Sequence, residues 1–332
     1  MSDRKKTLFI VWKAYQRRVD SISDYLDLSI VYYHYHWEEK SKWLKALSYI
    51  LKSIETVIDL IKYRPAFVFV QLPPTPVLYL VGIYCAIMRK PYVADCHNAM
   101  FLEWWINWPL AKYLLRKASA VIVHNKNLIQ YSNESGIQTI TVRDPLPLAK
   151  QISKTGVLNR FNLKSREYMI VPWNLASDEP IEEFIEAVKL IPERKFAMTW
   201  FYERLPEYLK KNLPDNLIFT DYLEINEFND LFANAGAAIS LTDQQGTQPS
   251  AAAEAIAFDI PIVLSDTETA RNLYKNAPVF VHNDRKSIAN GILEVFNNHS
   301  SYELKVKNFK YLLRTELEKE VDTLKTKINW QT

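Results

Sequence analysis

The sequence predicts two α/β domains in tandem, each a Rossmann-like parallel sheet covered by helices on both faces. Short apolar runs alternate with stretches of helical periodicity along most of the 332 residues. Continuous apolar strands joined by crossover helices are typical of parallel sheets that are buried on both faces. The Pro-rich, polar stretch DPLPLAKQISKTGVLNRFNLKSRE interrupts the alternation once, near the middle of the chain. A chain of this length fits two domains of ordinary size.

The first half contains five predicted strands and two long predicted helices. The strands are KTLFIVW, SIVYY, AFVFVQL, YVADC and AVIVHN. Apolar residues recur at helical spacing from Trp43 to Ile61, and a second helix is expected over residues 77–88. We expect the Trp43 helix to turn its apolar stripe towards the sheet, because a helix that covers a sheet needs such a stripe.

The second half repeats the pattern. Strands are expected at YMIVPW, KFAMTWF, NLIFTDY, AAISL, PIVLSD and PVFVHN, with helices after ASDEP and at EINEFNDLFANA. The predicted boundaries are a first domain over 1–148, a linker over 149–166, a second domain over 167–300, and C-terminal helices over 301–332 that pack back on the first domain. Ligands bind at the carboxyl ends of parallel strands, and two such domains are expected to face one another across a cleft.

Composition places the chain among globular proteins, with 48% hydrophobic and 24% charged residues. Cys85 and Cys96 lie in apolar surroundings and are expected to be reduced core thiols of a cytoplasmic protein. No cleavable signal is expected before the first strand, and the longest apolar run, PVLYLVGIYCAIM, is too short to span a bilayer.

Charge is distributed unevenly along the chain. Residues 1–150 carry 20 Lys and Arg against 12 Asp and Glu, a net charge of +8, and the remainder carries 21 against 26, a net charge of −5. The first half is therefore a candidate for peripheral contact with an anionic partner, such as the inner face of the plasma membrane. The alternative is a surface whose charge is merely uneven.

Several cofactor motifs are missing from the sequence. It has no G-x-G-x-x-G, G-x-x-x-x-G-K-[ST], H-E-x-x-H or paired C-x-x-C, which disfavours a dinucleotide oxidoreductase, a P-loop enzyme and a zinc hydrolase. It also lacks the Asp-x-Asp pair that could hold a metal-bound diphosphate. We therefore expect no cofactor and no metal. A nucleotide would be held by backbone amides, helix N-termini and basic side chains.

The stretch LTDQQGTQPSAAAEAIAFDIPIVLSD, residues 241–266, surrounds one carboxylate inside a helix with small residues. It predicts a strand, a loop and a helix that has Pro249 in its first turn. Small side chains let a ligand approach the backbone, whose N–H groups at a helix start suit phosphate. Glu254, one turn inside the helix, could accept two hydrogen bonds from a vicinal diol such as a ribose. Alternatively, Glu254 is only favoured there by the helix dipole.

This region resembles the family-four glycosyltransferases of the GT-B fold. GTQPSAAAEAIAFDIPIVLSD is similar to their donor-binding segment, FTDYLEINEFNDLFANAGAAISLT to the preceding strand, base-binding loop and helix, and VPWNLASDEPIEEFIEAVKLI to the start of their donor domain. In the first half, VQLPPTPVLYLV and KPYVADCHN resemble the acceptor domain of lipid-linked mannosyltransferases. The resemblance covers most of the chain. It implies that the second domain binds a nucleotide sugar and the first an acceptor.

The resemblance also implies roles for single residues of the donor domain. Glu254 matches the second Glu of the family's Glu-x7-Glu motif, which holds the ribose, whereas the first Glu falls at Gly246. Asp243, Gln244 or Gln245 could take over the hydroxyls of the donor sugar. The other expected donor-binding residues are Thr247, Gln248 and Ser250 in the loop and first turn, Asn174 and Ser177 where the family has Arg and Lys, and Arg17, Arg18 or Arg271 for the phosphate charge.

Asp95, His97 and Asn98 match the Asp-x-His-Asn stretch of the acceptor domain. The match implies that His97 lies beside the reacting sugar, where it could hydrogen-bond a sugar hydroxyl or the leaving phosphate. If the enzyme inverts configuration, His97, Asp95 or Glu103 could be the general base. Without the match, a lone His at a strand end would be interpreted as structural. Asp243 is the remaining candidate catalytic residue.

The segment NAMFLEWWINWP groups four aromatic residues just beyond that strand, and three basic residues follow: Phe101, Trp104, Trp105 and Trp108, then Lys112, Arg116 and Lys117. Trp is favoured at membrane interfaces, and basic side chains can reach anionic headgroups. One interpretation is a lip that receives a lipid-linked acceptor or rests on the bilayer. The other is a helix that packs its aromatic side chains into the core.

The sequence therefore predicts a metal-independent, hexosyltransferase-type glycosyltransferase. It would move a sugar from a nucleotide-diphospho-sugar to a saccharide or polyprenyl-linked acceptor in polysaccharide assembly. The resemblance favours retention of the anomeric configuration, and Gly246 leaves inversion open. Two other hypotheses are a sugar-nucleotide epimerase on the same fold and a catalytically weak binding partner in a polysaccharide-assembly complex. No nucleic-acid partner is expected.

Overall fold

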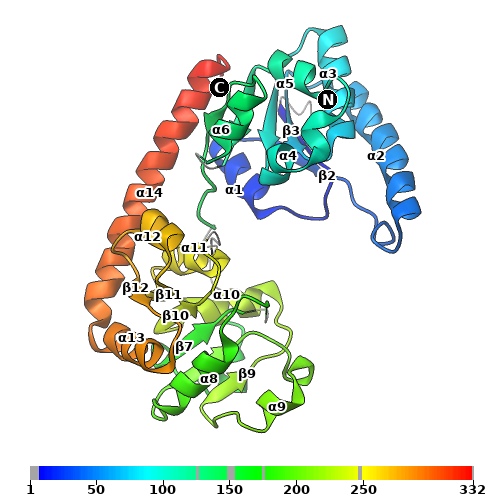
Figure 1. Cartoon of the computed structure of the whole chain (residues 1–332). Coiled ribbons are helices and arrows are strands. Elements are labelled where there is room, and N and C mark those ends of the chain that lie inside the picture. The colour runs from blue at the N-terminus through cyan, green and yellow to red at the C-terminus, as the bar shows by residue number, and fades with distance from the viewer. Residues whose placement is uncertain (1–6, 125–126, 148–153, 174–175, 246–248, 331–332) are drawn as a thin grey trace. The chain divides into compact units, whose positions relative to one another are not determined.

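The computed structural model describes residues 7–124, 127–147, 154–173, 176–245 and 249–330. The chain divides into two compact units (Figure 1). Unit 1 comprises residues 1–145 and 315–332, and unit 2 comprises residues 146–314. Within the described residues each unit holds one parallel sheet of six strands with helices packed on it, so the predicted α/β fold class is confirmed.

The sheet of unit 1 has the strand order β2-β1-β3-β4-β5-β6, with every pair of neighbours parallel. Its strands are β1 (Thr7–Val11), β2 (Ser29–Tyr32), β3 (Phe67–Leu72), β4 (Tyr92–Cys96), β5 (Ala120–Val123) and β6 (Ile140–Thr141). Successive side chains point to opposite faces of a strand. Leu8 and Ile10 therefore pack in one core layer, and Phe9 and Val11 pack in the other.

Helices cover both faces of this sheet. They are α1 (Arg17–Leu26), α2 (Lys42–Tyr63), α3 (Thr75–Met88), α4 (Asn98–Leu102), η1 (Trp104–Asn107), α5 (Ala111–Lys117), α6 (Asn127–Glu134) and the end of α14 (His299–Lys327). Leu317 and Leu324 of α14 share a core with Phe69. Arg143 donates hydrogen bonds of 2.7–3.0 Å to Glu320 from its backbone and its guanidinium. These contacts fasten the end of α14 to unit 1.

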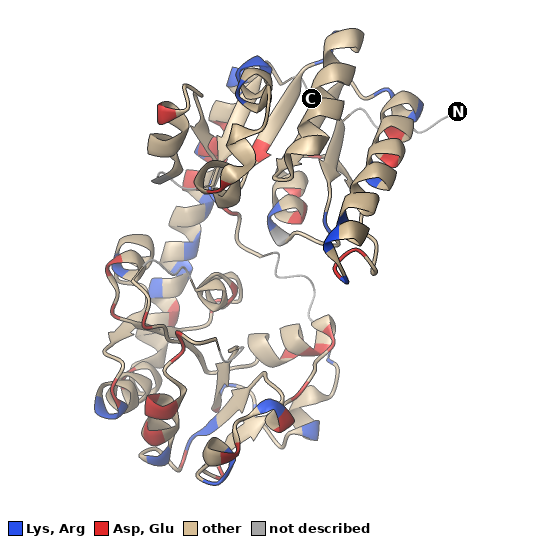
Figure 2. Ribbon diagram, turned by 45° about the vertical axis from the view of Figure 1, so that its right-hand side comes forward, with Lys and Arg blue, Asp and Glu red and all other residues tan. Residues whose placement is uncertain are grey.

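Helix α2 turns the opposite way from the prediction. Its buried residues are Ser48, Lys52, Thr56 and Leu60. Most of the apolar residues from Trp43 to Ile61 are exposed instead, although Leu44 and Leu51 are half-buried, so the expectation of an apolar stripe facing the core is wrong. The reason is a set of polar contacts on the inner face: Lys52 forms a 2.6 Å ion pair with Glu38. Trp12 donates its indole N–H to Thr56 at 3.0 Å. Figure 2 shows Lys or Arg near both ends of α2.

The sheet of unit 2 has the order β12-β11-β10-β7-β8-β9 and is also parallel. Its strands are β7 (Tyr168–Val171), β8 (Lys195–Met198), β9 (Leu217–Phe219), β10 (Ala237–Ser240), β11 (Ile262–Ser265) and β12 (Val279–Val281). Its helices are α7 (Val157–Arg160), α8 (Ile181–Lys189), η2 (Tyr202–Arg204), α9 (Glu207–Lys210), α10 (Ile225–Ala233), α11 (Ser250–Ala257), α12 (Glu268–Tyr274), α13 (Arg285–Asn297) and the start of α14. Val157 and Leu163, which lie in the expected linker, pack in the core of this unit.

Each sheet has a topological switch point, where the winding of the chain reverses direction. In unit 1 it lies between β1 and β3, and in unit 2 between β7 and β10. Loops that follow these strands meet at the carboxyl edge of the sheet, which is where open α/β sheets bind ligands. A ligand site is therefore expected at the loops after β3, β4 and β5 in unit 1, and at the loops after β7 and β10 in unit 2.

Two smaller expectations concern the cysteines and the membrane. Cys85 and Cys96 are buried free thiols that form no disulfide, as expected. Burial raises the pKa of both thiols. Among the described helices, none combines the length and the apolar character that crossing a membrane requires.

Candidate functional site

The loop after β10 is held by hydrogen bonds to three other strand ends. Thr242 is buried, and its hydroxyl donates to Asp178, in the loop after β7, at 2.5 Å. Its backbone N–H donates to the Ser265 hydroxyl at the end of β11 at 2.9 Å, and its carbonyl accepts from the Asn283 amide after β12 at 2.9 Å. Thr242 and Ser265 are buried, and Asp178 and Asn283 are half-buried. A polar network paired in this way specifies one geometry. We call these four residues the Thr242 platform.

Asp243, a candidate catalytic residue, lies on the solvent side of this platform. Its carboxylate accepts from the Asn283 amide at 2.6 Å, and its backbone N–H donates to the Asp178 carbonyl at 2.7 Å. Gln245 accepts a hydrogen bond from the backbone N–H of Glu268, at 3.1 Å, and so helps to start α12. The platform thus holds Asp243 in one position while its carboxylate is exposed.

Helix α11 begins at Ser250 and carries Glu254 one turn inside. The two residues are four positions apart and share a face of the helix. Ser250 is exposed and Glu254 is half-buried. The alanines of the helix are largely in the core, where Ala252 and Ala255 pack against the sheet. Close helix–sheet packing therefore explains much of the Ala-rich composition, for which ligand access is the explanation expected from the sequence.

Other predicted donor residues are partly outside the described structure. Gly246, Thr247, Gln248 and Asn174 lie outside the described residues, and so does the side chain of Arg17. Ser177 is exposed in the loop between β7 and α8. Arg271, on α12, donates to Asp266 with an Nη2–Oδ2 distance of 2.6 Å, and its guanidinium lies 4.8 Å from the centre of the Phe280 ring. The positive charge of Arg271 is therefore paired with the carboxylate of Asp266, which follows β11.

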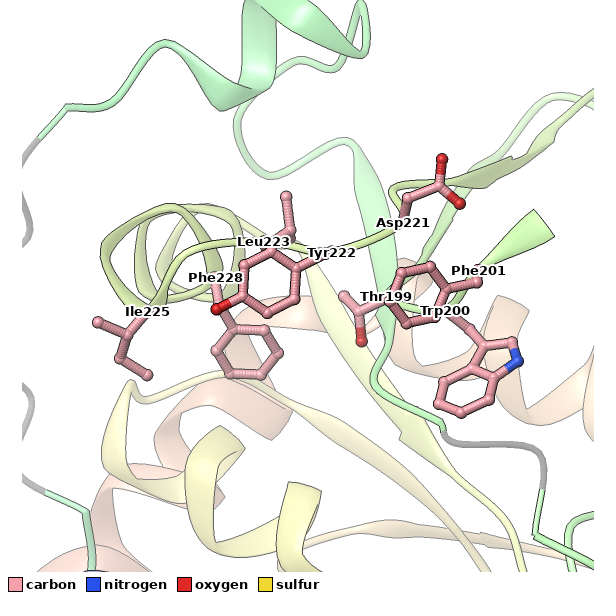
Figure 3. Close-up of a pocket in the computed structure, with 8 residues that line it drawn as sticks. All are labelled: Thr199, Trp200, Phe201, Asp221, Tyr222, Leu223, Ile225 and Phe228. Atoms are coloured by element: carbon pink, nitrogen blue, oxygen red, sulfur yellow. The ribbon is translucent and has the colours of Figure 1, made fainter. Parts of the chain in front are cut away.

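A shallow aromatic pocket of about 360 Å³ lies beyond the ends of β8 and β9 (Figure 3). Its lining residues are Thr199, Trp200, Phe201, Asp221, Tyr222, Leu223, Ile225 and Phe228. The Trp200 indole N–H is buried and has no hydrogen-bond partner in the described part of the chain. Flat aromatic walls beside a polar rim suit a planar ring. Only the resemblance points to this loop, and no sequence pattern predicts these residues individually.

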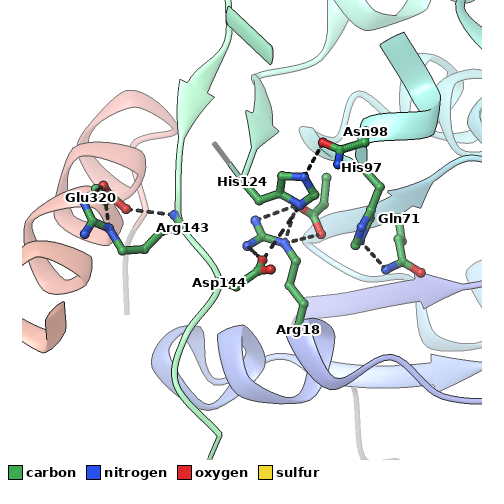
Figure 4. A network of polar contacts seen from close by, with 9 residues as sticks. Arg18, Gln71, His97, Asn98, His124, Arg143, Asp144 and Glu320 are labelled. Atoms are coloured by element: carbon green, nitrogen blue, oxygen red, sulfur yellow. Dashed lines mark hydrogen bonds and ion pairs between the residues drawn. The ribbon is translucent and has the colours of Figure 1, made fainter. Parts of the chain in front are cut away.

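In unit 1, Arg18 joins two carboxylates at the carboxyl edge of the sheet (Figure 4). Its Nε and Nη2 atoms donate to Asp95 at 2.9–3.2 Å, and Nη1 donates to Asp144 at 2.6 Å. Asp95 is 1% exposed. Burial alone would raise the pKa of Asp95, but the Arg18 charge outweighs it and holds this pKa below the ordinary value. Arg18, one candidate for the phosphate charge, thus has its donors occupied by carboxylates.

His97 follows β4 and lies beside this ion pair. The Gln71 amide donates to His97 Nε2 at 2.8 Å, so that nitrogen is an acceptor and the ring proton of the neutral side chain is on Nδ1. Burial lowers the pKa of His97 to about 4. At neutral pH the structure therefore has a neutral imidazole with an N–H that is available as a donor.

His124, after β5, is a second histidine at the same edge, and it is not among the residues expected from the sequence. The rings of His97 and His124 meet edge to face with centroids 5.3 Å apart. His124 Nε2 donates to the Asn98 side-chain oxygen at 2.7 Å, and burial lowers its pKa. Its Nδ1 is buried and accepts no hydrogen bond within the described structure, although Asp144 lies 3.9 Å away. The only sequence signal was its place after an apolar strand.

The three tryptophans stack on one another next to this edge. Trp104 and Trp105 have ring centroids 4.5 Å apart, and those of Trp105 and Trp108 are 5.8 Å apart. Trp105 and Trp108 pack against the core of unit 1, whereas Trp104 is 57% exposed. Glu103 accepts the indole N–H of Trp105 at 3.2 Å. Two of the three rings therefore pack on the core, as the second interpretation expects, and Trp104 faces solvent. The lip for a lipid-linked acceptor or a bilayer stays a prediction.

Two Rossmann-like units with polar loops at their carboxyl edges define a protein of the GT-B fold class. Among solved structures, HepE from Anabaena in complex with UDP is similar, with 13% identity and a TM-score of 0.64 over 97% of this chain and 100% of that chain. A glycosyltransferase from Rickettsia africae has 12% identity and a TM-score of 0.64 over 97% and 99%. A UDP-GlcNAc 2-epimerase from Methanocaldococcus jannaschii has 15% identity and a TM-score of 0.59 over 92% and 99%. At these identities the likeness shows the fold.

No protein-family model matches the chain, and the comparison with curated proteins gives no match.

Proposed function

We propose that the chain is a glycosyltransferase that moves a sugar from a nucleotide-diphospho-sugar to a saccharide or polyprenyl-linked acceptor. The observation that carries the proposal is the carboxyl edge of unit 2. There the Thr242 platform, the start of α11 and the aromatic pocket lie at the ends of neighbouring strands around the switch point. HepE, which has been solved with UDP and with UDP-glucose, shares the fold.

Each part of this edge suits one part of the donor. The pocket offers Tyr222 and Phe228 for stacking on a base. Glu254 offers a carboxylate for a ribose diol, and the first N–H groups of α11 suit the diphosphate. Asp243, fixed by Asn283, is placed to bind hydroxyls of the donor sugar. We assign no metal, because the sequence lacks the Asp-x-Asp pair that would hold a metal-bound diphosphate.

His97 is assigned the role of a hydrogen-bond donor. Its Nε2 is taken by Gln71, so Nδ1–H would donate to a sugar hydroxyl or to the leaving phosphate. This arrangement disfavours His97 as a general base, because its acceptor nitrogen is already occupied. Asp95 is assigned a positioning role, since its carboxylate is buried against Arg18. A transferase that retains configuration needs no general base at this position, which agrees with the resemblance.

The acceptor is assigned to unit 1. Exposed Trp104 beside partly buried Trp105 offers an apolar surface at the edge that holds His97. Such a surface suits the first isoprene units of a polyprenyl-linked saccharide, and a peripheral position at the membrane would bring the protein to that substrate.

A product-release assay tests the proposal. The full chain is incubated with UDP-, GDP- and dTDP-sugars and with polyprenyl-linked saccharides, and release of nucleoside diphosphate is measured. We expect release from one donor that depends on an acceptor, and a loss of about tenfold or more in kcat/KM in Glu254→Gln. The matched control is Glu318→Gln, an exposed Glu of α14. Equal activity in both variants, or no release with any donor, would contradict the proposal.

A sugar-nucleotide epimerase is the second candidate, and His124 favours it. The sequence alone offers too few acid–base groups for such an enzyme, but the ring centroids of His97 and His124 lie 5.3 Å apart, which adds a second imidazole. Incubation of nucleotide sugars in deuterium oxide without acceptor separates the two functions. An epimerase that works by proton abstraction would incorporate deuterium into the sugar, whereas a transferase would leave the donor unlabelled.

A further inference from the structure

The outer face of α2 is an apolar surface exposed to solvent. It is formed by Trp43, Leu47, Ile50, Ile54, Val57, Ile58 and Ile61, whose side chains are between 39% and 87% exposed. We call these seven residues the α2 face. Soluble proteins rarely leave contiguous apolar surface of this kind uncovered, and an uncovered one marks an interaction site.

The spacing of these residues places them on one stripe. Intervals of three and four residues repeat from Trp43 to Ile61, which corresponds to a band about 100° wide and about 27 Å long. The stripe lies opposite the polar inner face, where buried Lys52 pairs with Glu38. Rotating the helix to bury the stripe would break that ion pair, so the exposure is built into the packing.

The neighbouring helix also exposes apolar side chains. α3 packs beside α2 (Figure 1) and exposes Ile83, Ile87 and Met88 near its end. Both of these neighbouring helices therefore expose apolar side chains to solvent. No described segment of the chain covers these side chains.

Positive charge borders the α2 face at both ends. Exposed Lys42 and Lys45 lie at its start, and exposed Lys62 and Arg64 lie at its end. Arg89 and Lys90 follow α3 and are also exposed. Glu55 is the one exposed acidic residue within α2, since Asp59 is half-buried and accepts from the Tyr33 hydroxyl at 2.8 Å.

We propose that the α2 face lies on an anionic lipid bilayer, with its apolar side chains in the headgroup region and the flanking Lys and Arg on the lipid charges. The pattern of an apolar stripe with basic ends is that of an interfacial helix. A second copy of the chain fits less well. Both ends of the stripe are basic, so pairing α2 with itself in either direction would bring like charges together. The proposal does not depend on the sugar chemistry proposed above.

Vesicle co-sedimentation tests the proposal. The full chain is mixed with phosphatidylcholine vesicles, with and without about one third phosphatidylglycerol, at low and high salt. We expect binding only to the anionic vesicles, weakened by salt. The variant Ile54→Gln with Ile58→Gln and Ile61→Gln should bind at least tenfold less. Leu304→Gln, an exposed apolar residue of α14, is the matched control and should bind like the wild type. Far-UV circular dichroism verifies that each variant is folded.

Three results would overturn the proposal. One is a wild-type chain that ignores anionic vesicles, and another is a triple variant that binds them as the wild type does. The third is a wild-type dimer, seen by light scattering, that the triple variant converts to a monomer without any vesicle binding. That result would assign the α2 face to a second copy.

Discussion

Replacing Arg18 by Met would leave the Asp95 carboxylate buried without a counter-charge. The guanidinium makes three contacts with Asp95 at 2.9–3.2 Å, and the two side chains are 3% and 1% exposed. Removing one partner of such a buried pair costs about 3–5 kcal/mol of unfolding free energy. The contact of Arg18 with Asp144 adds little to this figure, because the Asp144 side chain is 50% exposed.

The effect has a definite dependence on pH. In the wild type the pKa of Asp95 is lowered, so its contribution to stability is present at neutral pH and is lost only as the pH falls through that lowered value. In Arg18→Met burial would raise the pKa of Asp95 instead, and the variant would regain stability as the pH falls from 7 towards the ordinary Asp range. The pKa of the Asp95 carboxyl group therefore decides whether a fall in pH lowers or raises the unfolding stability of each protein.

Urea unfolding at pH 7 and pH 5, followed by Trp fluorescence, measures both effects. Seven of the nine tryptophans report on unit 1: Trp12, Trp37, Trp43, Trp104, Trp105, Trp108 and Trp330. Adding Asp95→Asn to Arg18→Met should recover part of the loss, because it removes the unpaired charge. A loss of less than about 1 kcal/mol in the single variant, or no recovery in the double variant, would refute the reasoning.

Three further predictions concern the two sheet edges. Tyr222→Ala should weaken UDP binding about fivefold or more, because stacking on a base contributes about 1–3 kcal/mol. Calorimetry measures this affinity, and an unchanged value would show that Tyr222 does not contact the base. Thr242→Val should lower unfolding stability by about 1–3 kcal/mol in urea denaturation, because Asp178 loses its hydroxyl donor, and an unaffected variant would mean that the platform is not rigid. His97→Gln should flatten the rise of stability between pH 4 and 6.5. The wild-type pKa of about 4 lies below that of the unfolded chain, so the unfolded state binds more protons across this window, and an unchanged slope would contradict the neutral imidazole.

The strands could be predicted because the sheets are parallel and buried on both faces. The run FVFV at the start of β3 is apolar at every position, because side chains on both faces of the strand are buried. β6 could not be predicted in this way, since a strand of two residues leaves no run. The order of strands, and hence the switch points, depends on pairing between distant segments that no local pattern reveals.

Helix α2 shows what periodicity leaves open. The spacing from Trp43 to Ile61 predicts a helix and an apolar stripe, but it does not say which face is turned inward. The direction depends on Lys52 and Glu38, which are buried as a pair and would each be expected on the surface. The rule that apolar residues face the core does not hold for α2, because an ion pair and an indole hydrogen bond lie on its inner face.

Only some residues of the candidate site could be predicted from the sequence. Asp95 and His97 were found because they follow a clear strand and match a known stretch, whereas His124 follows an equally clear strand without a match. The partner of Asp95 is Arg18, which is 77 residues earlier in the chain. Contacts over such separations arise from topology, so the two carboxylates beside Arg18 could not be predicted, and its role toward phosphate stays a prediction.

Binding of a nucleotide sugar is the central claim, and a thermal-shift screen of the full chain tests it most directly. UDP-, GDP-, ADP- and dTDP-sugars, with the free nucleotides, are each added in excess. A ligand at 100 times its Kd stabilises the folded state by about 2.7 kcal/mol, so we predict a clear rise in Tm with at least one nucleotide sugar, and a smaller rise in Glu254→Gln at the same concentration. A Tm that no nucleotide or nucleotide sugar raises would contradict the account.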